Sequence, residues 1–553
     1  MLQSTLNVPL EVKPESCSRL SALIEALRQR EDTGPFGQPD NFSRVMRDIP
    51  TLHFMSMSVF TAAEYDPIFI LEANFDGQPG VFWGQLEAAF GPDLREMLRC
   101  CKRPLDEDGP LYDAVTASDS RAPLAPYLEA RTQRPSVFHH GNRGLTRDRI
   151  LQEAALFVAV REELDDPGRP GPSPYRGRSA TEVHALLRKA MVPAHPWLGM
   201  SAPPRISRGE RLLDILRLVT FAVLLLLAFS LPAIVVAALM PWKAYVLLLL
   251  LVATATGLLI YAKRAPLPGT ETSAGPNLTR LILPKVPAIL GIVAAYVVVA
   301  ALVLTPLVSA TSHLLAWLGA GNLPATPGDA FWPVARAVLL GLLGLLLVIL
   351  PGLVLWLRYL ERHDSSHDAP HVDERLLREM VRREDWVAQN HMGSIVLIKP
   401  GVLRSIIIRA GHLGLGLVLR VVATDGYLGT MRTVHFAHWA FLNNGSRLLF
   451  FSNFDHSWDS YLDDFIEKAA GGLTLAWGCG VGFPPTRFLI YDGARHGRRF
   501  KNWALASRAV SRFWYSAYPT LTVDQIERNN RIADGLRRPE LSEVEARAWI
   551  SDL

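Results

Sequence analysis

The chain contains few cysteines, and their spacing excludes two common ways of stabilising a small domain. Only 4 occur among 553 residues: Cys17, Cys100, Cys101 and Cys479. No two of them have the spacing of a paired zinc-ligand motif, and together they do not form a disulfide framework. We therefore expect a protein of a reducing compartment.

Several signals of other protein classes are also missing. The net charge is only +4, and no lysine or arginine tract interleaved with aromatic residues occurs, so we expect no nucleic-acid partner. The first residues lack the basic and apolar segments of a signal peptide. No Walker or Gly-x-Ser-x-Gly motif is present, and the glycines at 411–416 do not have the context of a nucleotide-binding loop.

Charge is absent altogether from four long stretches. Residues 218–242, 244–262, 286–307 and 337–357 contain no Asp, Glu, Lys or Arg. Each is close to the roughly 20 residues that cross the hydrocarbon layer of a bilayer. A buried soluble helix seldom stays apolar on every face for that length. The sequence therefore predicts four transmembrane helices within 212–360 and a lipid bilayer as partner, and the uncharged spans argue against ion transport.

The distribution of basic residues predicts the orientation. Three segments beside the spans are rich in Lys and Arg: the one before the first span, the one between the second and third, and the one after the fourth. The other two connections carry little more than Lys243 and Arg336. Positive residues favour the cytoplasmic side. We expect a multi-pass protein of the inner (cytoplasmic) membrane with both termini in the cytoplasm.

Strand patterns occur on both sides of the membrane block. Residues 51–60 and 67–74 predict one strand pair, and residues 433–442 and 447–453 predict another around a turn at Asn444-Gly445. The apolar segment 405–422, interrupted by Arg409 and Arg420, fits the membrane surface or a buried sheet, with a fifth span as the alternative. The boundaries we expect are a helical lead at 1–44, a first copy at 45–165, a linker at 166–211, the spans at 212–360, a connecting segment at 361–430, a second copy at 431–540 and a final helix at 541–553.

The two soluble parts share short motifs in the same order. His53-Phe54 corresponds to His435-Phe436, Asn74-Phe75-Asp76 to Asn453-Phe454-Asp455, and Leu145-Thr146-x-Asp148 to Leu521-Thr522-x-Asp524. Such self-similarity indicates an internal duplication. From the second strand of the C-terminal copy, the predicted order is strand-helix-strand-strand-helix-strand, with one extra strand before it; this order is ferredoxin-like and leaves one sheet face open. We expect an α+β membrane protein in which two ferredoxin-like repeats flank four transmembrane helices and pack sheet against sheet.

This arrangement resembles the dimeric α/β-barrel superfamily, which includes the dye-decolorising haem peroxidases and the chlorite dismutases. Asn74-Phe75-Asp76-Gly77 is similar to the Gly-x-x-Asp-Gly signature of those peroxidases, without its first glycine. These motifs and Lys399-Pro400-Gly401-x-x-Arg404 also resemble a family of bacterial membrane proteins labelled peroxidase-related. The resemblance implies a haem cofactor and an aspartate that moves protons. The Lys399 motif itself fits lipid phosphate contact or a solvated turn.

Two pairs of polar residues are the candidate catalytic groups. Asp76 and Asp455, with Asn74 and Asn453 beside them, each end a strand and precede a helix. One interpretation is structural: the aspartate caps that helix and the asparagine makes a turn. The other places both carboxylates at the mouth of a cavity between the sheets, where they would shuttle protons.

Histidines are the candidate cofactor ligands. His53 and His435 recur in both copies, and His438 and His456 lie near the second of them; His139 and His140 offer an option in the first copy. Strand alternation would place His435 on the face of Trp439 and His438 on the other. If haem or a metal ion is bound, these are the residues to hold it. Otherwise they are hydrogen-bonded core residues.

Two functions are compatible with these features. The first is a membrane-anchored, peroxidase-like oxidoreductase that acts on an apolar or lipid-derived substrate in a cavity between the repeats. The second is a non-catalytic membrane scaffold that binds a lipid or a protein. A bound haem would favour the first, and tolerance of Asp76→Asn or Asp455→Asn would favour the second.

Overall fold

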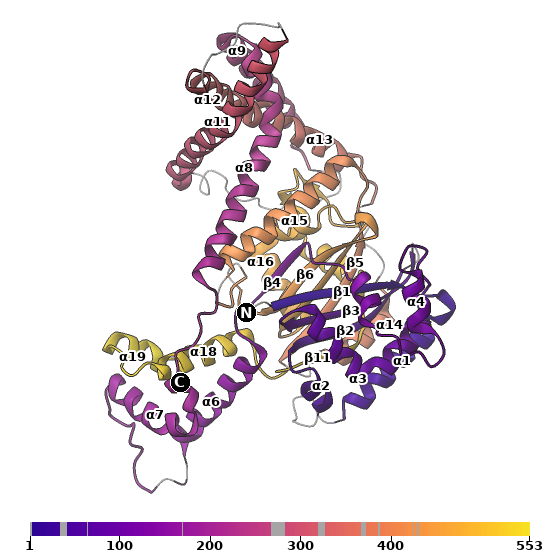
Figure 1. Ribbon diagram of the computed structural model, residues 1–553, viewed down its shortest axis with the longest axis vertical. Coiled ribbons are helices and arrows are strands. Elements are labelled where there is room, and N and C mark those ends of the chain that lie inside the picture. The colour runs from indigo at the N-terminus through magenta and orange to yellow at the C-terminus, as the bar shows by residue number, and fades with distance from the viewer. Residues whose placement is uncertain are drawn as a thin grey trace.

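The computed structural model describes residues 3–33, 41–62, 65–166, 168, 170–266, 283–318, 327–366, 372–384, 388–423, 425–428 and 431–553. Two antiparallel sheets form the body of the protein, and long apolar helices project from one end of it (Figure 1). The protein is therefore α+β with helices long enough to cross a membrane, which confirms that part of the predicted fold class.

The first sheet is built mainly from N-terminal residues. Its strand order is β1 (Gln3–Glu11), β3 (Tyr65–Asp76), β2 (Leu52–Ala62) and β11 (Ser511–Ser516), and all neighbours are antiparallel. Alternate residues of these strands, such as Phe69, Leu71 and Phe75, are buried in a core with helices α1 (Cys17–Glu31) and α3 (Pro79–Arg99). Its edge strand β11 comes from the far end of the chain.

The second sheet is built mainly from C-terminal residues. Its order is β10 (Arg508–Ala509), β5 (Gln389–Leu397), β7 (Arg447–Asp455), β6 (Val434–Leu442) and β4 (Val137–His140). Helices α15 (Val402–Val422) and α16 (Trp458–Trp477) cover its outer face. Here the edge strand β4 comes from the N-terminal half. Each half therefore gives one strand to the sheet of the other.

The inner faces of the two sheets pack against each other. Phe60 and Ile70 of the first sheet share a core with Ile395, Leu449 and Phe451 of the second. The rings of Phe60 and Phe451 meet edge to face, with centroids 6.1 Å apart. Hydrogen bonds between the sheets, described below, complete the contact. The interior is consequently apolar at one end of the strands and polar towards the other.

A helical layer covers one end of the body, where the termini of several helices are capped. It contains α6 (Arg147–Asp165), α7 (Ala180–Ala194), α18 (Val523–Arg537) and α19 (Glu543–Ile550). Three of these helices begin with a capping box, formed by Ser179 with Glu182, Thr522 with Gln525 and Ser542 with Glu545. They explain why these helices begin where they do.

Five helices meet the length and hydropathy expected of a membrane span. They are α8 (Arg208–Leu239), α9 (Trp242–Ala262), Leu283–Trp317 with α11 (Val286–Trp317), Gly328–Arg362, and α15. The fourth comprises α12 (Pro327–Gly344), a π-helical turn and α13 (Leu350–Arg362). Length and composition alone do not decide which of them cross.

Sheet connectivity separates α15 from the other four helices. Strand β5 precedes α15, whereas its neighbour β7 follows it, and the two pair along nine residues. A crossing by α15 would put them on opposite sides of a membrane. Helix α15 therefore lies on the sheet, which excludes both the fifth span and a sheet at 405–422. By the same argument the two halves lie on one side, since β4 pairs with β6 and β11 with β2.

Buried ion pairs join the sheets to the spans. Asp214 in α8 is buried and lies 2.8 Å from Arg143 and 3.7 Å from Arg420 of α15. At the end of α13, Asp364 lies 2.8 Å from Lys399 and 3.3 Å from Arg404. Although burial opposes it, Lys399 lowers the pKa of Asp364 to about 2. The Lys399-Pro400-Gly401-x-x-Arg404 motif thus anchors α15 to the last span, and Lys399 is not exposed to lipid phosphate.

Three elements differ from the sequence-based expectation. The lead at 1–44 contains the helix expected, but it begins with strand β1, whose Leu6, Val8 and Leu10 alternate into the core. Residues 473–478, a short apolar run of the kind that predicts a strand, instead continue α16 past a kink at Ala469. The connecting segment 361–430 contains β5 and α15. In each case packing on a sheet decides the conformation.

Candidate functional site

The first copy of the repeated motifs meets at one buried site. His53 Nε2 lies 3.1 Å from Asp76 Oδ2, and His53 Nδ1 lies 2.9 Å from the Tyr518 hydroxyl. The same Asp76 oxygen accepts a hydrogen bond of 2.8 Å from the backbone N–H of Arg147, the first residue of α6. His53 is fully buried and Asp76 is 9% exposed. Asp76, at the end of β3, therefore connects this strand to its neighbour β2 and to the distant helix α6.

The second copy repeats this geometry with its own residues. His435 Nε2 lies 2.8 Å from Asp455 Oδ1, and Asp455 Oδ2 accepts a hydrogen bond of 2.9 Å from the backbone N–H of Val523. Val523 is the first residue of α18, as Arg147 is of α6. The three motifs that the two halves share in sequence are thus the three parts of one structural unit.

The aspartates cap helices, although not the helices expected. The sequence suggested that Asp76 and Asp455 cap the helices that follow them, α3 and α16. Those helices have Gln78 and Ser457 at the capping position instead. Asp76 and Asp455 receive N–H groups from α6 and α18, where a negative charge is favoured by the helix dipole. The prediction that these aspartates bind the N-terminus of a helix is therefore correct, but the helices predicted were wrong.

The two His–Asp pairs, His53 with Asp76 and His435 with Asp455, lie close to each other between the sheets. The His53 ring lies 5.4 Å from that of Phe436, and the His435 ring lies 5.4 Å from that of Phe54. The two phenylalanine rings are 5.5 Å apart. Aromatic side chains therefore occupy the space between the two His–Asp pairs.

Tyr518 forms a hydrogen bond with the histidine of only the first His–Asp pair. It bonds His53, and burial raises its pKa well above the ordinary value. The corresponding Nδ1 of His435 has no hydrogen-bond partner among the described residues. The two His–Asp pairs therefore differ in what surrounds the Nδ1 atom of the histidine.

The remaining cofactor candidates are dispersed. His438 Nε2 lies 2.8 Å from Asn7 Oδ1, and burial lowers the pKa of His438 to about 4. His456 is exposed at the end of β7, with φ of +67°. A bulge between Val434 and Phe436 lets both His435 and His438 reach the inner face, whereas Trp439 packs outside on Trp477. The expected separation of His435 from His438 is therefore wrong.

These histidines do not fit a haem or metal site. Among the described residues, no group of three or more His, Cys, Asp or Glu could hold a metal ion. His435 already bonds Asp455, His53 lies against Asp76, and aromatic rings fill the space beside both histidines. Burial also lowers the pKa of His139 to about 4 and that of His140 well below its ordinary value.

Asn74 and Asn453 bind one buried carboxylate, which the sequence did not single out. Asn74 Nδ2 donates to Glu72 Oε1 at 2.7 Å, and Asn453 Nδ2 approaches the same oxygen at 3.5 Å from the opposite sheet. Their own oxygens accept hydrogen bonds from Thr5 and Trp514. The structure brings the two asparagines together and separates them from the two aspartates.

Glu72 belongs to a polar cluster between the sheets. Its other oxygen accepts from Ser56 at 2.8 Å and lies 3.2 Å from His391 Nε2. His391 Nδ1 in turn lies 2.6 Å from the Ser511 hydroxyl. Burial opposes ionisation of Glu72, but His391 lowers the pKa of Glu72 to about 2. The one sequence signal was an acidic residue within an otherwise apolar strand.

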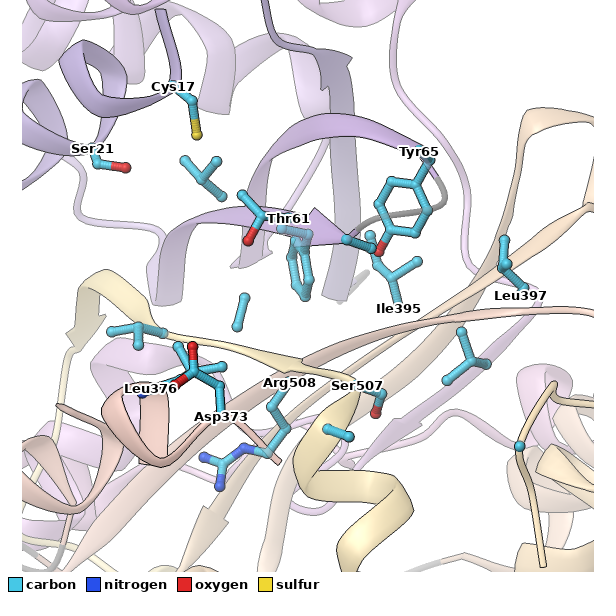
Figure 2. Close-up of a pocket in the computed structure, with 18 of the residues that line it drawn as sticks. Cys17, Ser21, Thr61, Tyr65, Asp373, Leu376, Ile395, Leu397, Ser507 and Arg508 are labelled. Carbon is cyan, nitrogen blue, oxygen red and sulfur yellow. Dashed lines mark hydrogen bonds between the residues drawn. The ribbon is translucent and has the colours of Figure 1, made fainter. Parts of the chain in front are cut away.

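Two large cavities open beside this cluster. The strand-end cavity, about 900 Å³, lies between the ends of β2 and β5 and is shown in Figure 2. The arginine cavity, about 860 Å³, is lined by Arg28, Arg375, Arg378, Arg382, Arg383 and Arg508, together with His391, Ser511 and Trp514. Arg508, Ala509 and Val510 line both.

The cavities, not the His–Asp pairs, are therefore the accessible parts of the interior. None of His53, His435, His438 and His456 is among the described residues that line either cavity. No family model, curated protein or solved structure matches this chain.

Proposed function

We propose that this protein is a membrane-anchored ligand-binding protein. Two ferredoxin-like repeats would hold a lipid-derived amphipathic molecule in the strand-end cavity, on the cytoplasmic side of an inner membrane. The observation that carries the proposal is the lining of this cavity and its position next to the last span. The basic segments beside the spans support the cytoplasmic side.

The duplicated architecture supports the two repeats. In each half the first strand pairs with the third and the third with the second, and each half places its last strand in the other sheet. The matching His–Asp–helix contacts support the same equivalence. Exchange of strands makes one body of the two repeats, so that a cavity between their strand ends has a fixed shape.

The lining of the strand-end cavity supports an amphipathic ligand. Phe60, Ile395, Leu397, Val481 and Trp503 provide apolar surface. Hydroxyl groups of Ser21, Thr61, Tyr65 and Ser507 provide polar contacts, with Asp373 and Arg508 at one side (Figure 2). Polar and apolar surface are present in similar amounts in this cavity, and its size is that of a site for one small molecule, so an amphipathic ligand fits it better than a purely apolar one.

The position of the cavity supports a ligand that comes from lipid. Ser365 and Ser366 line it, and they follow directly after α13 ends at Arg362. Asp364, between them and the span, is fixed by Lys399 and Arg404. The wall of the cavity is therefore joined through a rigid connection to a membrane helix.

A cavity-filling variant tests this function. Ala506 lines the strand-end cavity, and Ala506→Trp would occupy part of its volume. The probe is cis-parinaric acid, a fluorescent fatty acid, titrated into the full-length protein in nanodiscs. We expect Ala506→Trp to weaken binding by about tenfold or more, equivalent to about 1.4 kcal/mol.

The matched control is Ala548→Trp, at an exposed position of α19. It adds the same side chain outside the cavity and should bind as the unmodified protein does. Equal affinity in both variants would show that the fatty acid binds elsewhere, for example along the spans, and would refute the proposed function.

A further inference from the structure

We propose that Ser511, His391 and Glu72 form a nucleophile–base–carboxylate relay on the wall of the arginine cavity, which hydrolyses a carboxylic ester that carries an anionic group. This site lies beside the strand-end cavity and does not depend on a ligand bound there. The inference rests on four observations: the chain of hydrogen bonds, the fixed imidazole, the access to Ser511 and the charge around it.

The hydrogen bonds define the direction of proton transfer. A carboxylate accepts hydrogen bonds but cannot donate them, so the Nε2 atom of His391 carries the proton that faces Glu72, 3.2 Å away. Nδ1 of the neutral ring is then an acceptor, and the Ser511 hydroxyl at 2.6 Å donates to it. This is the order of contacts that activates a serine: hydroxyl, base and an acid that orients the base.

The imidazole and the carboxylate are held in place by their surroundings. The His391 ring stacks on Phe451, with centroids 5.3 Å apart, and lies 6.3 Å from the Trp514 ring on a nearly parallel plane. Glu72 is fully buried and is also held by Ser56 and Asn74. A base fixed in this way needs little reorganisation when it takes a proton.

Ser511 is accessible at a break in the strand pairing. It is half-buried and lines the arginine cavity. The register between β11 and β2 shifts between Ser511 and Phe513, which indicates a bulge. Bulges redirect side chains and are frequent beside active sites. The hydroxyl therefore reaches both His391 and open space.

The charge of the cavity selects the substrate class. Arg383 and Arg508 pair with acidic residues, the first with Glu25 and the second with Glu384. Arg375 and Arg378 of α14 (Glu374–Arg383) are exposed, and neither has a carboxylate partner in the part of the chain that the structure describes. These two guanidinium groups are therefore available to an anionic group of the substrate.

The reaction follows from these positions. Ser511 Oγ attacks the ester carbonyl carbon while its proton passes to His391 Nδ1, and Glu72 stabilises the imidazolium. The C–O bond of the ester breaks, the alcohol leaves with the proton from Nδ1, and the acyl group remains on Ser511. Water then attacks the acyl carbon with His391 as base and releases the acid, so that one ester and one water give one acid and one alcohol.

Two esters and one covalent probe test the site in the full-length protein in nanodiscs. The esters are 4-nitrophenyl hemisuccinate, which is anionic, and 4-nitrophenyl butyrate, which is neutral; the probe is a fluorophosphonate located by peptide mass spectrometry. We expect hydrolysis of the hemisuccinate in preference to the butyrate, and labelling of Ser511. Arg378→Gln should reduce that preference because it removes an unpaired cation.

Substitutions of the three relay residues distinguish a loss of catalysis from a loss of folding. Ser511→Ala and His391→Gln should each lower the hemisuccinate rate on the order of 10²-fold or more and abolish labelling of residue 511. Glu72 is a positioning residue: Glu72→Gln should lower kcat and leave KM unchanged. Ser551→Ala, which changes an exposed serine whose hydroxyl donates to the Ala548 carbonyl, should retain full activity.

The proposal fails if the unmodified protein neither hydrolyses these esters nor reacts with the probe, or if Ser511→Ala hydrolyses them at the full rate. It also fails if the label resides on another serine. His391→Gln retains the serine and so remains informative if Ser511→Ala does not fold. Failure here leaves fatty-acid binding by the strand-end cavity unaffected, so the two proposals are tested separately.

Discussion

Asp455 accepts a hydrogen bond with one oxygen from His435, at 2.8 Å, and with the other from the first N–H of α18, at 2.9 Å. Both partners are donors, and the carboxylate is almost fully buried. An ionised aspartate satisfies both at once. Asparagine of the same shape cannot, because its amide group has a single acceptor oxygen.

Asp455→Asn should therefore destabilise the protein by about 2 kcal/mol, because one buried donor faces the amide NH₂ group. Thermal unfolding followed by tryptophan fluorescence in detergent would measure the loss. Asp76→Asn should cost less, because His53 Nε2 and the Arg147 N–H both face Oδ2 of Asp76, and a single amide oxygen at that position can serve both. The control is Asp459→Asn, whose side chain is 75% exposed and which should stay within about 0.5 kcal/mol. Equal stability of all three variants would contradict the structural role of these aspartates.

The sheet connectivity predicts that both termini lie on one side of the membrane and Lys243 on the other. A membrane-impermeant maleimide applied to intact cells should label Lys243→Cys, in the first turn of α9 beside its short connection to α8, if the termini are cytoplasmic. Ser173→Cys, between α6 and α7, should be labelled only after the cells are opened. The unmodified chain, with its 4 native cysteines, is the control. Labelling of both positions from the same side would contradict four crossings.

Close approach of α8 and α12 requires a glycine. A Cβ atom at Gly341 would lie 2.8 Å from the backbone Cα and N atoms of Ile234, which cannot move aside without shifting the helix. Small residues at such contacts allow membrane helices to pack closely. Gly341→Ala should therefore cost about 1–3 kcal/mol in detergent unfolding experiments. Gly352→Ala, where a Cβ atom meets open space, should not destabilise, and similar losses at both sites would argue against this contact.

Buried histidines predict an acid-sensitive fold. Burial lowers the pKa of His139, His412 and His438 from 6.5 to about 4. Between pH 6.5 and 4 the unfolded chain therefore binds more protons than the folded chain, so stability is full above pH 6.5 and falls as the pH drops towards 4. Unfolding midpoints measured from pH 7.5 to 4.5 should show this decrease.

His412→Gln provides the corresponding variant. His412 bonds the Ser136 hydroxyl and the Ala476 carbonyl, and an amide can donate and accept similar bonds. Because glutamine does not titrate, the loss of stability below pH 6.5 should be smaller in this variant. A slope identical to that of the unmodified protein would show that His412 does not contribute.

The sequence and the structure agree where the evidence was local. Capping boxes such as Ser179/Glu182 depend on residues close in the chain, and the charge-free spans depend on composition alone. The repeated motifs around His53, Asp76 and Thr146 were recognised because both halves retain them, and the structure brings them together. Their partners were not predicted, because the choice of helix depends on how distant segments pack.

The cluster around Glu72 could not be recognised for a different reason. Glu72, His391 and Ser511 lie on three strands from distant parts of the chain, and the two halves do not share the arrangement. Thr5, at the position in β1 that corresponds to His391 in β5, bonds Asn74 instead. Neither repetition nor spacing therefore marks these residues.

The exchange of edge strands also determines when the protein can mature during synthesis. Strand β11, which completes the first sheet, begins at Ser511, far along the chain from its neighbour β2, which ends at Ala62. Ribosomes must therefore synthesise the chain as far as Ser516, and the apolar helices must enter the bilayer, before the N-terminal sheet gains its last neighbour. Until then β2 presents an unpaired edge, which makes chaperone contact or aggregation of nascent chains the main hazard on the route to the native state.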